Sequence, residues 1–75
     1  MIQEAIEKVS RGESEVTVDF SSVSRIDSKD VAALEELAAQ ADARSVKVTL
    51  RAVNMDIYLV LKQLALTRCF TFSVA

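Results

Sequence analysis

The chain has 75 residues, 51% of them apolar and 27% charged, and its nine basic and eleven acidic side chains give a net charge of −2. This length allows one domain, and this apolar content supports a packed core. The charge balance lacks the basic field of nucleic-acid-binding proteins, and no apolar run approaches the roughly 20 residues that cross a bilayer. The start, MIQEAIEKVS, lacks the features of a signal peptide. We expect one cytoplasmic domain over residues 1–75, with no nucleic-acid partner and no membrane insertion.

Three scarce residue types exclude much chemistry. The chain has no histidine, so the commonest general base and metal ligand is missing. Cys69 is the single cysteine, which excludes an internal disulfide and a thiolate zinc site, and we expect it to be a small core residue. Gly12 is the single glycine, so neither a P-loop nor a dinucleotide-binding turn can form. The composition therefore indicates a binding module without cofactor or metal rather than an enzyme.

The first half of the chain predicts a helix, a strand and a second helix. Before Gly12, apolar residues recur at helical spacing, and residues 15–20 alternate apolar and polar side chains as a half-buried strand does. Residues 29–43 form the second predicted helix, capped by Asp27 or Ser28. Its expected buried stripe is Val31, Leu34, Leu37, Ala38 and Ala41.

The second half repeats the pattern. Residues 46–50 and 70–74 alternate again as strands, and Asn54 is a suitable N-cap for a third helix between them. The expected buried stripe of that helix is Ile57, Val60, Leu61 and Leu64.

The order of helices and strands predicts the topology. Strands separated by helices pair in parallel through right-handed crossovers. Each strand keeps one polar side, so helices are expected on one face of the sheet only. Successive crossovers on one face require the sheet to grow in one direction. The predicted fold class is therefore α/β: a single parallel sheet of about three strands in sequential order, with helices on one face.

Ser28 is the residue best placed for function, because helix N-termini and loops converge at the carboxyl ends of parallel strands. Capping the helix and recognising a partner are equally weighted roles for it. Opposite the buried stripe of its helix, small side chains lie among carboxylates and leave a flat strip for another protein, although alanine is also simply the best helix former. The candidate contact residues of this region are Ser28, Lys29, Ala32, Glu35, Glu36 and Ala39.

Two further interpretations concern other residues. Met55 and Leu59 point away from the predicted core stripe of the third helix, and Met is an adaptable contact residue; packing beneath a loop or the last strand is the competing explanation. Asp27 and Asp30 are the only carboxylate pair that suggests catalysis. Without histidine or a metal-ligand cluster, we rank an enzyme last.

The stretches VTVDFSSVSRIDSKDVAALEELAAQA and VKVTLRAVNMDIYLVLKQLAL resemble the STAS domain, a family named after sulphate transporters and anti-sigma-factor antagonists. The resemblance runs from about Glu15 to Phe72. Its most specific part is Val18-Asp19-Phe20, followed by Ile26-Asp27-Ser28 at the entry to a helix. It implies a single STAS-like domain that docks on other proteins and catalyses no reaction.

In anti-sigma-factor antagonists, the resemblance implies, the loop and following helix bind a kinase-type ATPase that phosphorylates a serine in an Asp-Ser-Ser-Gly motif. This chain has Asp27-Ser28-Lys29-Asp30, so Lys29 stands in place of that serine. Ser28 is still a candidate phosphorylation site as the neighbouring hydroxyl, and Ser22 and Ser24 are further candidates.

A motif with one hydroxyl residue followed by a residue that cannot be phosphorylated is more similar to that of the STAS subunit of the bacterial lipid-asymmetry ABC transporter. That subunit binds the cytoplasmic ATPase subunit of the transporter. The similarity extends to Val53-Asn54 and Tyr58. The resemblance thus implies an anti-sigma kinase or an ABC-type ATPase as partner, with the residue at position 28 supporting the interface.

Members of the family normally begin with one or two more strands before the first helix. This chain has none, so we expect strand 15–20 to be an open edge, which proteins usually cover by further pairing. The leading hypothesis is regulatory docking on an ATPase-type partner through the Ser28 loop and helix 30–43. The alternative is a structural module that homo-oligomerises, as in a homodimer, through the edge strand together with Met55 and Leu59.

Overall fold

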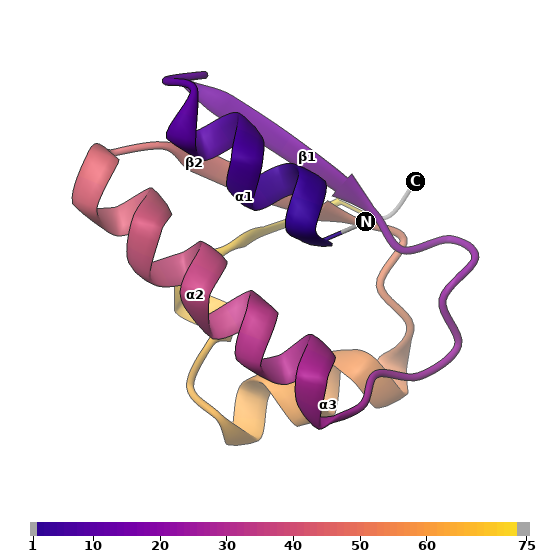
Figure 1. Cartoon of the computed structure of the whole chain (residues 1–75). Coiled ribbons are helices and arrows are strands. Elements are labelled where there is room, and N and C mark those ends of the chain that lie inside the picture. The colour runs from indigo at the N-terminus through magenta and orange to yellow at the C-terminus, as the bar shows by residue number, and fades with distance from the viewer. Residues whose placement is uncertain (1, 74–75) are drawn as a thin grey trace.

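The computed structural model describes residues 2–73, which form one α/β layer (Figure 1). Its elements are α1 (Ile2–Ser10), β1 (Glu15–Asp19), α2 (Ser28–Arg44), β2 (Lys47–Arg51), α3 (Met55–Gln63), the 3-10 turn η1 (Thr67–Cys69) and β3 (Thr71–Ser73). The strands are parallel and lie in the order β1-β2-β3, which confirms the predicted topology. Boundaries differ from the expected ones by one or two residues. The predicted end of the last strand, Val74, lies outside the described residues.

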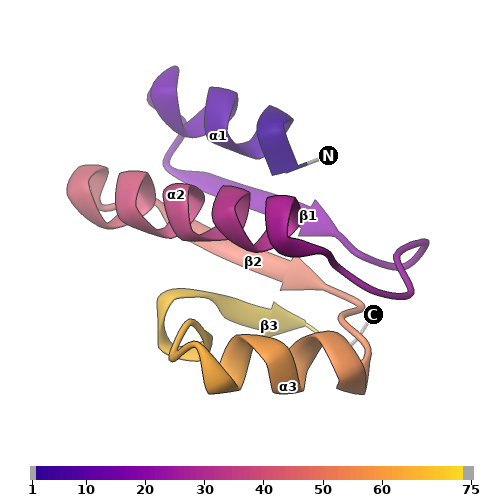
Figure 2. The same ribbon diagram turned by 60° about the horizontal axis from the view of Figure 1, so that its bottom comes forward.

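Helices cover one face of the sheet, as predicted (Figure 2). Val16 and Val18 of β1 are buried beneath them, as are Val48 and Leu50 of β2. The alternating residues point to the opposite face, where those of β1 are exposed. Because side chains alternate along a strand, this pattern lets one face bury a core while the other stays hydrated.

The core fills the space between the inner face of the sheet and the three helices. Phe20, Leu34, Leu37, Leu50 and Leu61 have no exposed surface. The radius of gyration of 11.2 Å matches the roughly 11 Å expected of a compact chain of this length. At the end of α1, Gly12 adopts φ 87° and its N–H donates to the carbonyl of Val9, which closes the helix as its sequence position predicted.

Of the four residues predicted to form the buried stripe of α3, two are buried and two are exposed. Ile57 and Leu61 are buried, but Val60 and Leu64 are 36% and 43% exposed. The helix ends at Gln63 and lies at the β3 end of the layer (Figure 2), so the buried face of α3 is narrower than a full amphipathic stripe. Helical spacing alone could not show how little of this helix is covered.

Cys69 is exposed, so its predicted place in the core is also wrong. It ends the turn η1, and the residues that anchor this segment in the core are Leu66 before the turn and Phe70 after it. With those two side chains turned inward, the thiol lies exposed in a hollow between η1 and α2.

Candidate protein-docking surface

The loop between β1 and α2 is tethered at both ends. The N–H of Ser21 donates to Asp19 Oδ1 at 2.8 Å, and the N–H of Val23 donates to the carbonyl of Phe20 at 3.0 Å. Further along, Asn54 Nδ2 donates to the carbonyl of Ser24 at 2.9 Å and to that of Val23 at 3.4 Å. The loop that leads to α2 is therefore fastened to the residue that precedes α3.

Asp27 is the N-cap of α2. Its Oδ1 accepts the N–H of Asp30 at 2.9 Å, and Asp30 Oδ2 accepts the N–H of Asp27 at 3.1 Å, which completes a capping box. Of the two cap candidates, Asp27 is confirmed and the capping role predicted for Ser28 is wrong. Because both carboxylates bind backbone N–H groups, they are held as helix caps rather than aimed together at a substrate. This geometry gives no support to a catalytic aspartate pair.

Ser28 is the first residue of α2, and its side chain is exposed. Lys29, which follows it, is exposed as well. The hydroxyl of Ser28 thus stands at the positive end of a 17-residue helix, where N–H groups and the helix dipole favour contact with an electron-rich partner group.

The outward residues of α2 form one exposed line. This line, hereafter the α2 strip, consists of Ser28, Ala32, Glu35 and Ala39. Glu36 is exposed beside it and lines a groove of about 520 Å³ with residues of α1, Gln3 and Glu7 among them. The structure therefore brings together on one helix face the residues that the helical spacing placed there.

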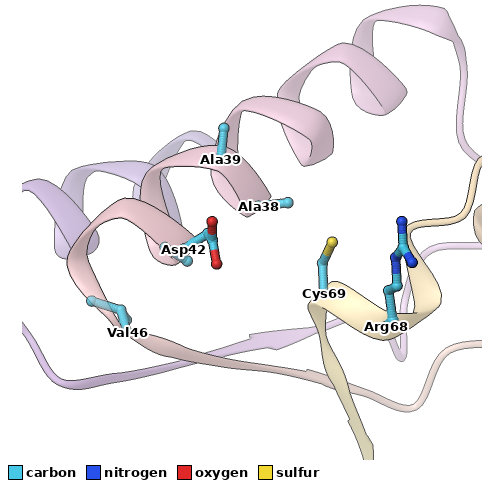
Figure 3. A pocket seen from close by; sticks show the side chains of 7 residues that line it. Ala38, Ala39, Asp42, Val46, Arg68 and Cys69 are labelled. Atoms are coloured by element: carbon cyan, nitrogen blue, oxygen red, sulfur yellow. The ribbon is translucent and has the colours of Figure 1, made fainter.

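A hollow of about 440 Å³ borders the other side of the α2 strip (Figure 3). Figure 3 shows Cys69 and Arg68 rising from η1 across from Ala38 and Asp42 of α2. Ala39 lies at its margin. No sequence pattern indicates this hollow, because it depends on where the turn after α3 returns beneath α2.

Met55 and Leu59 lie on α3, with 69% and 47% of their surfaces exposed, so they do not pack beneath the last strand or a loop. Tyr58 meets the ring of Phe72 edge to face, with centroids 5.2 Å apart. Together with Met55 and Val53, these rings line a hollow of about 350 Å³. In the sequence, only the resemblance to the STAS family draws attention to Tyr58. Its contact with Phe72 of β3 could be found only from the three-dimensional structure.

The loop between β1 and α2 also lies next to α3. Arg25 and Ile26 share a small hollow with Asp56 and Val60 at the start of α3. The exposed apolar residues of α3 and the N-terminus of α2 thus flank the same loop.

Two properties of the described residues, 2–73, limit the chemistry of this surface. They contain no group of three or more His, Cys, Asp or Glu side chains placed to hold a metal ion. None of the helices within this range has the length and apolar character needed to cross a membrane. What the surface offers is hydroxyl, carboxylate and small apolar groups on a rigid helix.

The described residues thus form a one-sided parallel α/β layer with strands in sequential order and an exposed helix N-terminus after β1. The family model described as "Mlab, STAS domain" matches residues 1–71. This chain belongs to that STAS family.

Among solved structures, the chain is similar to a candidate anti-sigma factor antagonist from Thermotoga maritima. The TM-score is 0.82 at 16% sequence identity, and the likeness covers 99% of this chain and 64% of the other. At this identity the likeness shows the fold, and the chain spans a little less than two thirds of the length of that protein. No curated protein sequence matches this chain significantly.

Proposed function

We propose that this chain is a non-enzymatic docking module that binds a cytoplasmic ATPase-type protein through the α2 strip. The observation that carries the proposal is the exposed Ser28 at the first position of α2, heading a line of small and acidic side chains. Membership of the STAS family supports it, because the loop and helix at this place serve as the partner surface in the anti-sigma-factor antagonists that the sequence resembles.

Each residue has a limited role in this proposal. The Ser28 hydroxyl hydrogen-bonds at the centre of the contact, and Ala32 and Ala39 let the partner backbone approach closely. Glu35 and Glu36 face basic groups of the partner, which favours rapid association at low salt. Lys29, Met55 and Leu59 lie at the periphery of the contact.

An ABC-type ATPase is the better candidate of the two partners. An anti-sigma kinase would need a phosphate acceptor, and Lys29 occupies the place of the usual serine. A phosphate on Ser28 itself would follow directly on the N-cap Asp27 and lie in the same helical turn as Asp30, so the repulsion of these two carboxylates offsets the attraction of the helix N-terminus. We therefore infer that Ser28 acts unmodified.

The test is a pair of binding assays with two purified proteins. One is the ABC ATPase, and the other is the anti-sigma kinase, whose genes lie nearest to the gene of this chain. Ser28→Asp and Ala39→Arg are each expected to weaken binding of the true partner at least about tenfold, because a charge or a long side chain would enter a close contact. Thr17→Asp and Thr71→Arg introduce the same kinds of charge at exposed strand positions on the face of the sheet that the helices do not cover, and both variants are expected to bind normally. Unchanged binding of both α2 variants would remove the α2 strip from consideration.

A further inference from the structure

The hollow between α2 and η1 has the size of a binding pocket (Figure 3). Its volume of about 440 Å³ lies within the ~300–1,000 Å³ of typical ligand pockets. Small apolar side chains line it from α2 and from the turn after that helix, namely Ala38, Ala39, Ala41 and Val46. Because an alanine side chain ends at Cβ, this part of α2 leaves room for a side chain from outside.

Charged side chains of opposite sign stand on the two walls of the hollow. Asp42 borders it from α2, and Arg68 borders it from η1, beside Cys69 (Figure 3). A carboxylate only accepts hydrogen bonds, and a guanidinium group only donates them. Arg68 would repel a cationic side chain that entered the hollow, and Asp42 would repel an anionic one. The hollow therefore suits an uncharged side chain that donates a hydrogen bond and attracts a cation.

Asp42 occupies a position that local helix preferences oppose. It lies in the last turn of α2, which ends at Arg44, and the free carbonyl groups of a last turn form the negative end of the helix dipole. Aspartate is also a weak helix former. The exposed carboxylate of Asp42 therefore destabilises the helix slightly. Residues that break a local rule in this way are expected where function requires them.

The indole ring of tryptophan meets each of these conditions. Its N–H donates a hydrogen bond and accepts none, which suits the carboxylate of Asp42. Among aromatic rings its face attracts a cation such as the Arg68 guanidinium most strongly. Its large apolar surface packs against the alanine side chains and Val46. This chain contains no tryptophan, so a second copy of it cannot supply the ring.

The hollow is continuous with the α2 strip. Ala39 belongs to the strip and also lines the hollow. A protein that lies along the strip from Ser28 to Ala39 therefore reaches the rim of the hollow. Tryptophan, tyrosine and arginine side chains inserted into pockets are commonly the strongest contacts of protein interfaces. Of these three, arginine is disfavoured by the charge of Arg68, and tyrosine has the weaker attraction for a cation.

We propose that the hollow between α2 and η1 binds a tryptophan side chain of a protein partner. The indole N–H donates to the Asp42 carboxylate, and the guanidinium group of Arg68 lies against the ring. For the identity of that partner the proposal rests on the proposed function, and it adds the chemistry that the partner must present beyond the α2 strip.

The first test uses the chain without a partner and N-acetyl-L-tryptophanamide as the probe. Cys69 is the single cysteine of the chain and lines the hollow, so its rate of alkylation by iodoacetamide reports whether the hollow is filled. A fragment of this size binds with a dissociation constant of about 1 mM, so the probe at several times that concentration is expected to slow alkylation about threefold or more. N-acetyl-L-leucinamide, which has no ring and no side-chain donor, is expected to have no effect.

Two variants remove the polar groups of the hollow. Asp42→Ala and Arg68→Ala are each expected to abolish protection of Cys69 by the probe. Glu15→Ala and Lys47→Ala remove the same kinds of charge from the face of the sheet that the helices do not cover, and are expected to keep it. Asp42→Ala is also expected to unfold at the same urea concentration as the wild type or a higher one, because it removes a charge that the helix dipole opposes. Lost binding without lost stability separates a contact residue from a structural one.

The second test separates this proposal from the docking proposal. In the complex with the ATPase partner, Cys69 is expected to be alkylated at least about tenfold more slowly than in the free chain. Alkylation at the free rate, in a complex that Ser28→Asp and Ala39→Arg weaken, would overturn the tryptophan pocket and leave the α2 strip standing. Protection of Cys69 by the probe, with partner binding unchanged in Ser28→Asp and Ala39→Arg, would overturn the α2 strip alone.

Three results with the free chain would also overturn the tryptophan pocket. One is alkylation of Cys69 that the tryptophan probe does not slow. Another is equal protection by the leucine probe, because it would show that the hollow takes any apolar group. The last is full protection by the tryptophan probe in both Asp42→Ala and Arg68→Ala, because the ring would then bind without the groups that are proposed to recognise it.

Discussion

At the carboxyl end of β1, the Asp19 carboxylate accepts the backbone N–H of Ser21 at 2.8 Å and so begins the turn that leads to α2. This hydrogen bond from the Ser21 N–H lowers the pKa of Asp19 below its usual 3.8, and the Ser21 hydroxyl and the positive charge of Arg51 add to the effect. A carboxylate with a lowered pKa stabilises the fold above its unfolded-state pKa and loses that contribution as pH falls through the folded-state value.

Replacing Asp19 by asparagine (Asp19→Asn) is therefore expected to lower the free energy of unfolding at pH 7, with the difference from wild type vanishing as pH falls below 3.8. Urea unfolding at neutral pH, near the usual carboxyl pKa and well below it measures this. Ser21→Ala removes the hydroxyl but keeps the backbone N–H, so it should retain most of the pH dependence. A difference between the Asp19→Asn variant and wild type that stayed constant over this pH range would contradict the assigned cause.

At the scale of elements, Asn54 joins two parts of the fold. Its Oδ1 accepts the N–H of Ile57 at 2.9 Å and caps α3, while its Nδ2 donates to the carbonyl of Ser24. The same side chain thus begins one helix and fixes the loop that enters the other. The position of Ser28 consequently depends on a residue 26 positions later in the sequence.

Asn54→Ala removes both interactions and is expected to cost about 1–2 kcal/mol of unfolding free energy. Asn54→Asp keeps a capping oxygen but turns a second oxygen towards the loop carbonyls. It should retain the helix cap while speeding amide exchange around Arg25 and Ile26. Denaturant unfolding and NMR exchange measure the two effects separately, and identical behaviour of both variants would show that the loop tether has no effect of its own.

For the whole molecule, one small core supports the layer. Stability of about 0.05–0.15 kcal/mol per residue implies roughly 4–11 kcal/mol for a chain of this length. Leu37 of α2 is fully buried between helix and sheet, whereas Leu59 of α3 is 47% exposed. The same chemical change at the two positions therefore tests where the core ends.

Leu37→Ala is expected to cost about 2–5 kcal/mol, a large share of the total, because it leaves a cavity in the core. Leu59→Ala is expected to change stability by no more than about 0.5 kcal/mol. Urea unfolding of both variants gives the comparison. A comparable loss for Leu59→Ala would mean that α3 is covered in solution, for example by a second copy.

Local sequence patterns were enough to predict the order and type of the described α-helices and strands, as well as the one-sided sheet, but not the 3-10 turn η1. Strict alternation in residues 15–20 and 46–50, and the apolar spacing of residues 29–43, are local patterns that few other structures satisfy. The outward line from Ser28 to Ala39 follows from helical geometry for the same reason.

What lies over each surface could be learned only from the three-dimensional arrangement. Periodicity gives the direction of a side chain but not whether another element covers it, so Val60, Leu64 and Cys69, all predicted to lie in the core, are exposed. The choice of Asp27 over Ser28 as helix cap, the tether from Asn54 to the loop, and the hollow between α2 and η1 likewise depend on where backbone segments meet. Contacts between such segments are set by packing across the whole chain, because the local sequence does not specify the distance between segments that are far apart in the sequence.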